Sequence, residues 1–253
     1  MTKKIQRGVA SVEVAGAILQ ILRGSARSME LRELALIGGL SASRLHHYLV
    51  SLVRLGLVHR DPATARYELG PFAMELGLVA ADELPAQHAS APWLRKLSEE
   101  TGESSFFAVP SPRGALIVRW EQGAHPLTVH ARLGTIMPIL TSATGLIWLA
   151  FAEQQSRAVF EGELRRVSPA ARKKVQRERL AQADEVRRQG MAAARGTMIA
   201  NVNAVACPVM GRSGALIGIL TVLGLGPGFD SSAQGDIAKR LRQCALAFGS
   251  RQA

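Results

Sequence analysis

Apolar residues recur at helical spacing in three stretches near the start of the chain. In the third stretch, Leu45, Leu49, Leu52 and Val53 fall at i, i+4, i+7 and i+8, which places them on one side of a helix. Two glycines in "GGL" at 38–40 indicate a tight break before it, because glycine adopts backbone angles closed to other residues. The pattern predicts helices over about 11–23, 29–37 and 41–55, with Ser11 and Ser28 at the first two starts.

The next fourteen residues, "LVHRDPATARYELG", predict two short strands around a turn at Asp61 and Pro62. In the second strand, Tyr67 and Leu69 alternate with polar residues, as expected for a hairpin with one covered face. Helix, helix, turn, helix and hairpin is the order of a winged helix-turn-helix domain, in which the hairpin is the wing. We assign this domain to residues 1–75.

Residues 76–91 are expected to be a linker, since a short helix at 72–80 gives way to a polar, proline-containing stretch. Beyond it, strands and helices alternate over residues 92–253. The expected strands are "SSFFAVP", "ALIVRWEQ", "LTVHARLG", "VNAVACPV" and "ALIGILTVLG", and the expected helices lie near 92–101, 143–153, 169–189 and 231–247. This second domain is predicted to be built on an antiparallel sheet, so the fold class is α+β.

The net charge of the chain indicates what kind of partner it binds. The 253 residues carry a formal net charge of +11, which favours an anionic partner and nucleic acid above all. Residues 1–70 and residues 157–188 each hold ten Lys and Arg against five Asp and Glu. The two cysteines, Cys207 and Cys244, are too few for a disulfide framework, so a reducing cytoplasm is expected. The histidines lack metal-ligand spacing, and we predict no metal, no cofactor and no membrane span.

The polar side of the third predicted helix carries the candidate DNA-reading residues. In a helix-turn-helix, the first turns of this helix enter the major groove, where Arg binds guanine and shorter polar groups bind bases or phosphates. Taken alone, each such Ser or His is more typical of a solvated helix face. The DNA interpretation rests on the context: the glycine break before the helix, the predicted wing, and the local positive charge. The predicted DNA contacts on the helix and the wing are Ser41, Ser43, Arg44, His47, Arg60 and Arg66.

At this point the chain resembles the IclR (isocitrate lyase regulator) family of bacterial transcription factors. The resemblance is carried by "ELALIGGLSASRLHHYLVSLVRLGLVHRDPATARYELG" in front, then "LSEETGESSFFAV", the "G-x-x-x-P…TSATG" of 134–145, and "GMAAARGTMIANVNAVACPV". It departs from the family at Arg44 and His47 in the recognition helix, so base preference is not transferred. It departs again at Gly196 and Thr197, where acidic residues are usual.

The resemblance implies a GAF-like effector domain over 92–253 that binds a small metabolite. Position matching places Cys207, Thr221 and Leu223 beside its cavity. Independently, a helix that starts near Ser142 would leave the N–H groups of Ala143, Thr144 and Gly145 free for a carboxylate, with Leu140 as an apolar wall. The other interpretation is that Thr141 and Ser142 only cap the helix. We expect a small organic acid as the effector. The apolar lining, and the ligands that the resemblance to the family implies, favour an aromatic acid.

Three function classes follow. A ligand-responsive, sequence-specific regulator that works as a homodimer or homotetramer on a double-stranded operator explains both halves of the chain. A nonspecific nucleic-acid-binding or scaffold protein would explain the charge alone. An enzyme with a winged-helix appendage would need an acid, base or nucleophile arrangement that residues 92–253 do not display at recognisable spacing.

Overall fold

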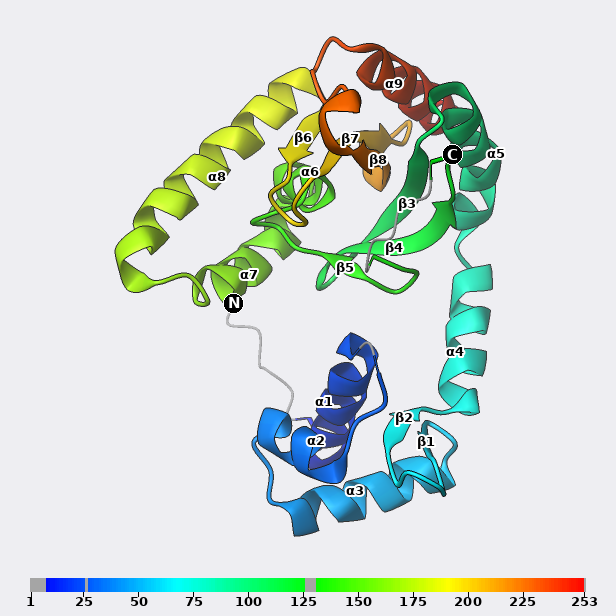
Figure 1. Ribbon diagram of the computed structural model, residues 1–253, viewed down its shortest axis with the longest axis vertical. Coiled ribbons are helices and arrows are strands. Elements are labelled where there is room, and N and C mark those ends of the chain that lie inside the picture. Colours follow the sequence, from blue (N-terminus) through cyan, green and yellow to red (C-terminus); the bar gives the residue numbers. More distant parts are fainter. Residues whose placement is uncertain (1–7, 26, 126–130, 253) are drawn as a thin grey trace. The chain divides into compact units, whose positions relative to one another are not determined.

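The computed structural model describes residues 8–25, 27–125 and 131–252. The chain divides into two compact units, Met1–Glu83 and Leu84–Ala253, whose elements are labelled in Figure 1. The first unit is helical with a two-stranded hairpin, and the second contains a six-stranded antiparallel sheet with helices. The fold class is therefore α+β, as the sequence pattern predicts.

The first unit has the predicted order of elements. It consists of α1 (Ala10–Gly24), α2 (Leu31–Gly38), α3 (Ala42–Arg54), β1 (Val58–Arg60), β2 (Tyr67–Leu69) and α4 (Pro71–Asp82). The leucines at 45, 49 and 52 on α3 are buried with Ile18 of α1 and Leu34 of α2. Val53, which the pattern assigned to the same stripe, is 38% exposed at its edge. Burial of this one stripe fixes which side of α3 faces solvent.

Side chains and one glycine set the bounds of the helices around the turn. Ser41 caps α3 by accepting a hydrogen bond from the Arg44 N–H at 3.3 Å. Gly39 ends α2 in the left-handed conformation, with φ of 62°. The predicted serine caps of α1 and α2 are wrong. Helix α1 begins before Ser11, and α2 begins after Glu30, which forms a capping box with Glu33.

The wing is a short antiparallel hairpin in which Val58 pairs with Leu69 and Arg60 with Tyr67. Its turn is closed by Asp61, whose carboxylate accepts hydrogen bonds from the Ala63 N–H and the Thr64 hydroxyl. These bonds hold the pKa of Asp61 below its ordinary value. The turn of the wing is therefore held by local hydrogen bonds.

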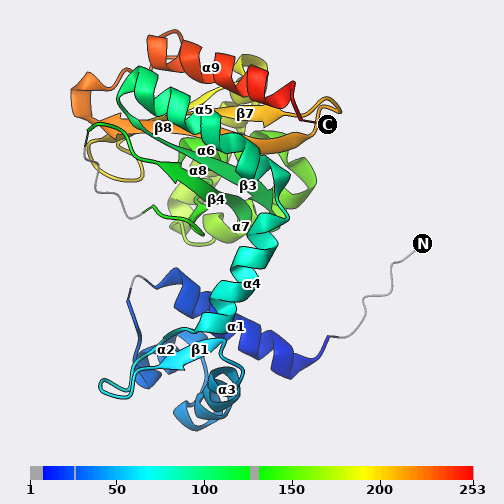
Figure 2. The same ribbon diagram turned by 90° about the vertical axis from the view of Figure 1, so that its right-hand side faces the viewer.

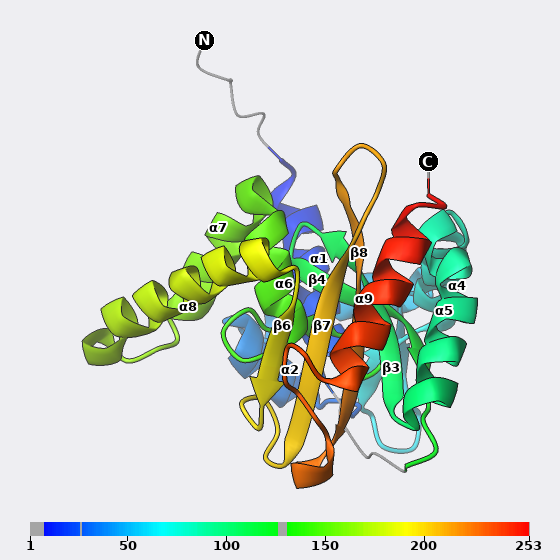
Figure 3. The same cartoon turned by 90° about the horizontal axis from the view of Figure 1, so that it is seen from above.

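The second unit is a sheet covered by helices on both faces. Its strands are β3 (Ser104–Ser111), β4 (Gly114–Glu121), β5 (Ile136–Met137), β6 (Ala192–Arg195), β7 (Val202–Met210) and β8 (Leu216–Leu225), in the spatial order β5-β4-β3-β8-β7-β6. Helices α5 (Pro85–Thr101) and α9 (Asp236–Gly249) cover one face. Helix α6 (Ala143–Phe151), with α7 (Glu153–Leu164) and α8 (Pro169–Gln189) beyond it, covers the other, as Figures 2 and 3 show.

Alternation along the strands gives each face its own core. On β7, Ala204 and Ala206 point to α6, whereas Val205, Cys207 and Val209 point to α5 and α9. The α6 side also contains the fully buried Trp148 and Ile139. This alternation decides which residues of β7 and β8 lie near the α6 helix start.

Several bounds differ from the sequence prediction. Helix α5 begins at Pro85 rather than near 92, because a proline is well placed in the first turn of a helix and Pro92 is tolerated inside it. Most of the expected linker 76–91 is thus helical. Helix α7 and strand β6 have no clear periodic pattern and were not predicted. The expected strand "LTVHARLG" lies partly outside the described residues, and its end at 131–134 is not a strand.

Candidate DNA interface and effector cavity

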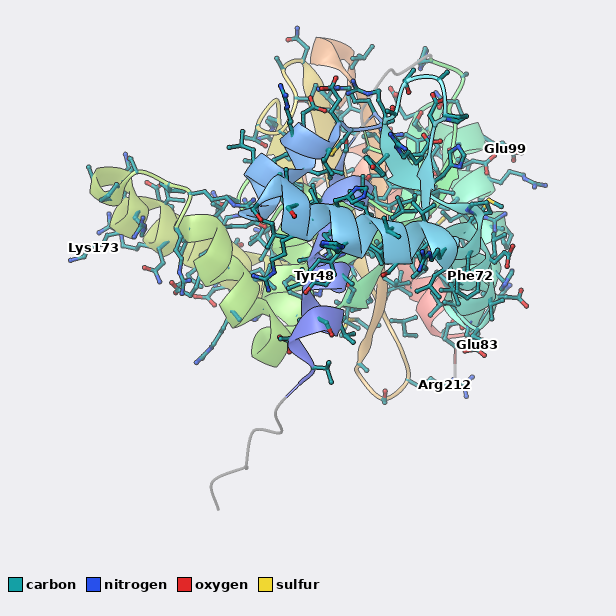
Figure 4. All side chains as sticks on the ribbon, turned by 90° about the horizontal axis from the view of Figure 1, so that it is seen from below. Tyr48, Phe72, Glu83, Glu99, Lys173 and Arg212 are labelled. Atoms are coloured by element: carbon teal, nitrogen blue, oxygen red, sulfur yellow. The ribbon has the colours of Figure 1, made fainter. Side chains whose placement is uncertain are left out.

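The outer face of α3 is polar and accessible. The side chains of Ser43, Arg44 and His47 are exposed, and the leucine stripe on the opposite side is buried. Figure 4 looks onto this helix, on which Tyr48 is labelled. The Ser41 hydroxyl is used as the cap, so its part in this face is to fix the helix start. The geometry leaves Arg44 free to present its guanidinium fork to a base edge.

A cleft with about 770 Å³ of open and enclosed space separates α3 from the wing. Its lining residues are Glu30, Leu31, Arg32, His46, Arg60, Thr64, Ala65 and Tyr67. The Arg60 guanidinium lies over the Tyr67 ring, 5.8 Å from its centre, which directs it along the wing. Arg32 and His46 were not assigned a role from sequence. Their helical positions indicated exposure, but only the folded hairpin shows that they border the same cleft.

Arg66 does not occupy the position predicted for it. Its guanidinium donates to the Ser28 carbonyl at 3.0 and 3.1 Å and forms ion pairs with Glu30 at 2.7 Å and Glu33 at 3.1 Å. The pKa of Glu33 lies below its ordinary value, because its carboxylate accepts a hydrogen bond from the Glu30 N–H and interacts with the guanidinium groups of Arg27 and Arg66. This network joins the second strand of the wing to the start of α2. Arg66 is therefore a structural residue, and a phosphate contact would require it to leave these partners.

We expect Arg66→Met to destabilise the first unit by about 1–3 kcal/mol, because several partly buried acceptors lose their charged donor. Urea unfolding of the full chain, followed by helix content, measures this change. The matched variant is Arg60→Met on the same hairpin. It should leave stability within about 0.5 kcal/mol and weaken binding to any duplex DNA instead. If instead Arg66→Met weakened DNA binding and Arg60→Met lowered stability, Arg66 would be the DNA contact.

An apolar cavity lies in the second unit between the start of α6 and strands β3, β7 and β8. It holds about 460 Å³ of open and enclosed space, and its lining residues are Phe106, Ala131, Met137, Ser142, Ala143, Thr144, Ala194, Met198, Ile199, Val202, Ala204, Thr221 and Leu223. Its polar groups include the hydroxyls of Thr144 and Thr221, which are 2.9 Å apart. None of these lining residues carries a formal charge, so a polar ligand group must be bound by hydrogen bonds.

The N-terminus of α6 supplies such donors. The Ser142 hydroxyl caps the helix by accepting from the Gly145 N–H at 2.8 Å and donates to the Pro138 carbonyl at 2.7 Å. One of the three N–H groups expected to be free is therefore used by the cap. Those of Ala143 and Thr144 remain at the positive end of the helix, in residues that line the cavity.

Two charged side chains on α7 and α8 fix the segment that leads into α6. The Glu163 carboxylate accepts from the N–H groups of Ile139 and Leu140 at 2.9 and 3.0 Å. The Arg179 guanidinium donates to the carbonyls of Ile139 and Ser142, both at 2.7 Å. Burial lowers the pKa of Arg179 to about 10, against the attraction of Glu163. These roles were not predicted from sequence, because both residues sit in a charged run that resembles a solvated helix.

Some predicted cavity residues lie elsewhere. Cys207 faces α5 and α9 on the opposite side of the sheet, since its partner across the ladder is Leu220 and not Thr221. Burial raises the pKa of its thiol to about 12, which does not suit a nucleophile. Leu140 packs at the edge of the core and does not line the cavity. Gly145 faces the Pro138 carbonyl, where a Cβ atom would collide.

The described loop 196–201 borders the cavity through Met198 and Ile199. Gly196 and Asn201 are in the left-handed conformation, with φ of 61° and 63°. The Thr197 hydroxyl donates to the Thr141 carbonyl at 2.6 Å, which ties the loop to the segment before α6. Gly196 and Thr197 thus add no negative charge beside the cavity.

The described part of the chain contains no group of three or more His, Cys, Asp or Glu side chains arranged to hold a metal ion. Within the same residues, no helix has the length and apolar character needed to cross a membrane.

Comparison with known proteins agrees with this two-part arrangement. Residues 11–62 match the model of the IclR helix-turn-helix domain, and residues 79–249 match that of the bacterial transcriptional regulator IclR C-terminal domain. The chain belongs to the IclR family. Its members include the HTH-type transcriptional regulator XynR of Escherichia coli K12, which is 26% identical over 243 residues, 95% of this chain and 96% of the relative.

Solved structures in the IclR family are similar over nearly the whole chain. HmgR of Pseudomonas aeruginosa is 33% identical, with a TM-score of 0.58 and coverage of 95% of this chain and 97% of that one. An IclR homologue from Microbacterium hydrocarbonoxydans, solved in complex with 4-hydroxybenzoate, is 20% identical, with a TM-score of 0.71 and coverage of 94% and 97%. The protein is thus a transcriptional regulator of this family, with an N-terminal IclR helix-turn-helix domain and an IclR C-terminal domain.

Proposed function

We propose that this IclR-family regulator reads a double-stranded operator with α3 in the major groove and responds to a small organic acid in the cavity beside α6. The exposed face of α3, with its capped start and buried leucine stripe, is the observation that carries the DNA half. Ser43, Arg44 and His47 are assigned to the major groove, with Arg60 near phosphate. We assign DNA binding to residues 1–75, effector binding to 92–253, and the cytoplasm as the compartment.

The cavity supports an acid with an apolar body. Its lining is almost entirely apolar, and the N–H groups of Ala143 and Thr144 at the positive end of α6 can bind a carboxylate. The 4-hydroxybenzoate complex of the Microbacterium hydrocarbonoxydans homologue supports an aromatic acid by analogy.

Two substitutions at the cap of α6 test this assignment. Ser142→Asp and Ser142→Asn both keep an N-cap side chain, but only Asp adds a negative charge beside the expected carboxylate position. We expect benzoate and 4-hydroxybenzoate to bind the Asn variant within about threefold of wild type and the Asp variant at least about tenfold more weakly. Calorimetry on the full chain, with the matched benzamides as neutral controls, measures both effects.

Equal acid binding by the two variants, or a preference for the amides, would remove this helix start as the acid site. For the acid to change DNA affinity, the protein must have two conformations that differ in DNA affinity, and the acid must bind one of them more tightly than the other. Turnover of any of the probe acids by the wild-type chain would favour the enzyme alternative.

We propose a homo-oligomer, dimeric at least, because one recognition helix reads only a few base pairs. Helix α4 has no buried residue, yet Phe72, Met74, Leu76, Leu78 and Val79 are 40–65% exposed along it, and Val9 and Val12 are exposed at α1. Phe72 is labelled in Figure 4. We expect twice the chain mass or more at micromolar concentration by light scattering, and a lower mass for Leu76→Glu/Val79→Glu. A monomeric wild type, free and on DNA, would contradict the proposal.

A further inference from the structure

A second cleft in the effector unit lies away from the cavity beside α6. It is formed by the C-terminal ends of α6 and α8, the second half of β7 and one side of α9, and it holds about 780 Å³ of open and enclosed space. Its walls include three arginines, Arg187, Arg188 and Arg242, and no acidic residue. Phe151, Met210 and Leu246 give it an apolar surface, and Leu246 is 75% exposed.

The three arginines differ in how their charge is satisfied. Arg187 donates to the Ala150 carbonyl and pairs with Asp184, and Arg188 pairs with Glu185. Arg242 is partly buried on α9 and has no hydrogen-bond or ion-pair partner among the described residues. A guanidinium that has lost part of its hydration without gaining an acceptor favours an anion at that point.

The edge of the sheet indicates whether the anion is a peptide or a small molecule. Strand β6 pairs with β7 only as far as Ala206, so Cys207–Met210 has no neighbouring strand on that side among the described strands. Pro208 lies at this edge and has no N–H to donate. Addition of a peptide strand is therefore disfavoured, whereas a small molecule needs no ladder of backbone bonds.

We propose that this cleft binds a small amphiphilic carboxylate, distinct from the ligand of the α6 cavity. The carboxylate takes the fork of Arg242, whose charge has no carboxylate partner among the described residues, and the apolar body lies on Phe151, Met210 and Leu246. The two sites differ in physical character: the α6 cavity offers only neutral donors, and this cleft offers guanidinium groups. The proposal does not depend on the ligand of the α6 cavity.

Methionine methyl groups report the two sites separately. Met210 lines the second cleft, and Met137 and Met198 line the α6 cavity. The full chain with 13C-labelled methionine methyls is titrated with 2-naphthoate and with neutral 2-naphthamide. We expect a saturable shift of the Met210 signal with the acid, and about tenfold weaker saturation in Arg242→Gln.

Arg95→Gln is the matched control, since it removes one exposed positive charge from α5 outside the cleft. It should leave the Met210 titration unchanged. The proposal is overturned if only Met137 and Met198 respond, if the amide shifts Met210 as strongly as the acid, or if Arg242→Gln and Arg95→Gln behave alike. A Met210 response without one at Met137 or Met198 would support this cleft and count against the effector cavity.

Discussion

Replacement of Arg179 by methionine is expected to destabilise the effector unit by about 2–5 kcal/mol. The variant leaves the carbonyls of Ile139 and Ser142 without their donor and removes the charge that faces Glu163 in a mostly buried setting. Because the same carbonyls set the start of α6, acid binding in the α6 cavity should weaken as well. Urea unfolding of the full chain and calorimetry with 4-hydroxybenzoate measure the two losses.

Arg177→Met is the control for this experiment. Arg177 lies on the same helix two residues earlier, is exposed, and has no partner among the described residues. Its replacement should change stability by less than about 0.5 kcal/mol and leave acid binding intact. Similar losses in the two variants would mean that the charge of α8, and not the bonds of Arg179, stabilises the unit.

The second large effect is expected on DNA. Arg44→Ala should cost about 1–3 kcal/mol of binding free energy at the preferred operator and reduce the discrimination against other sequences, if Arg44 binds a guanine edge. Arg44→Lys keeps the positive charge and removes the planar fork. It should therefore lose most of the discrimination while it keeps more of the affinity for unrelated DNA.

Fluorescence anisotropy with a selected operator and a scrambled duplex, at one stated salt concentration, separates these outcomes. An equal loss on both duplexes in Arg44→Ala would assign Arg44 to a phosphate. No loss on either would place Arg44 outside the interface.

The DNA-binding unit could be predicted from sequence because its signals are local. The leucine stripe of α3, the Gly39 turn and the hairpin turn at Asp61 each depend on residues a few positions apart. The role of Arg66 could not be predicted. Its partners Ser28, Glu30 and Glu33 are more than thirty positions away, and an arginine on a wing strand has the same local pattern whether it binds phosphate or the protein itself.

The effector cavity was predicted only in part, for a related reason. The cap at Ser142 and the N–H groups of Ala143 and Thr144 at the helix start follow from the short motif there. The side of the sheet on which Cys207 lies depends on strand register, where a shift of one residue exchanges the faces. Glu163 and Arg179 reach the cavity wall only because α7 and α8 fold back on α6, and no local pattern reports this.

We propose that the chain recognises a DNA sequence and that a small organic acid alters this recognition. The most direct measurement is an anisotropy titration of the full-length protein against a genomic fragment that it selects and a scrambled duplex, with and without 4-hydroxybenzoate, at fixed salt. We expect about a thousandfold or greater preference for the selected duplex, and a shift of that affinity when the acid is present. Equal affinity for both duplexes, unchanged by the acid, would contradict it.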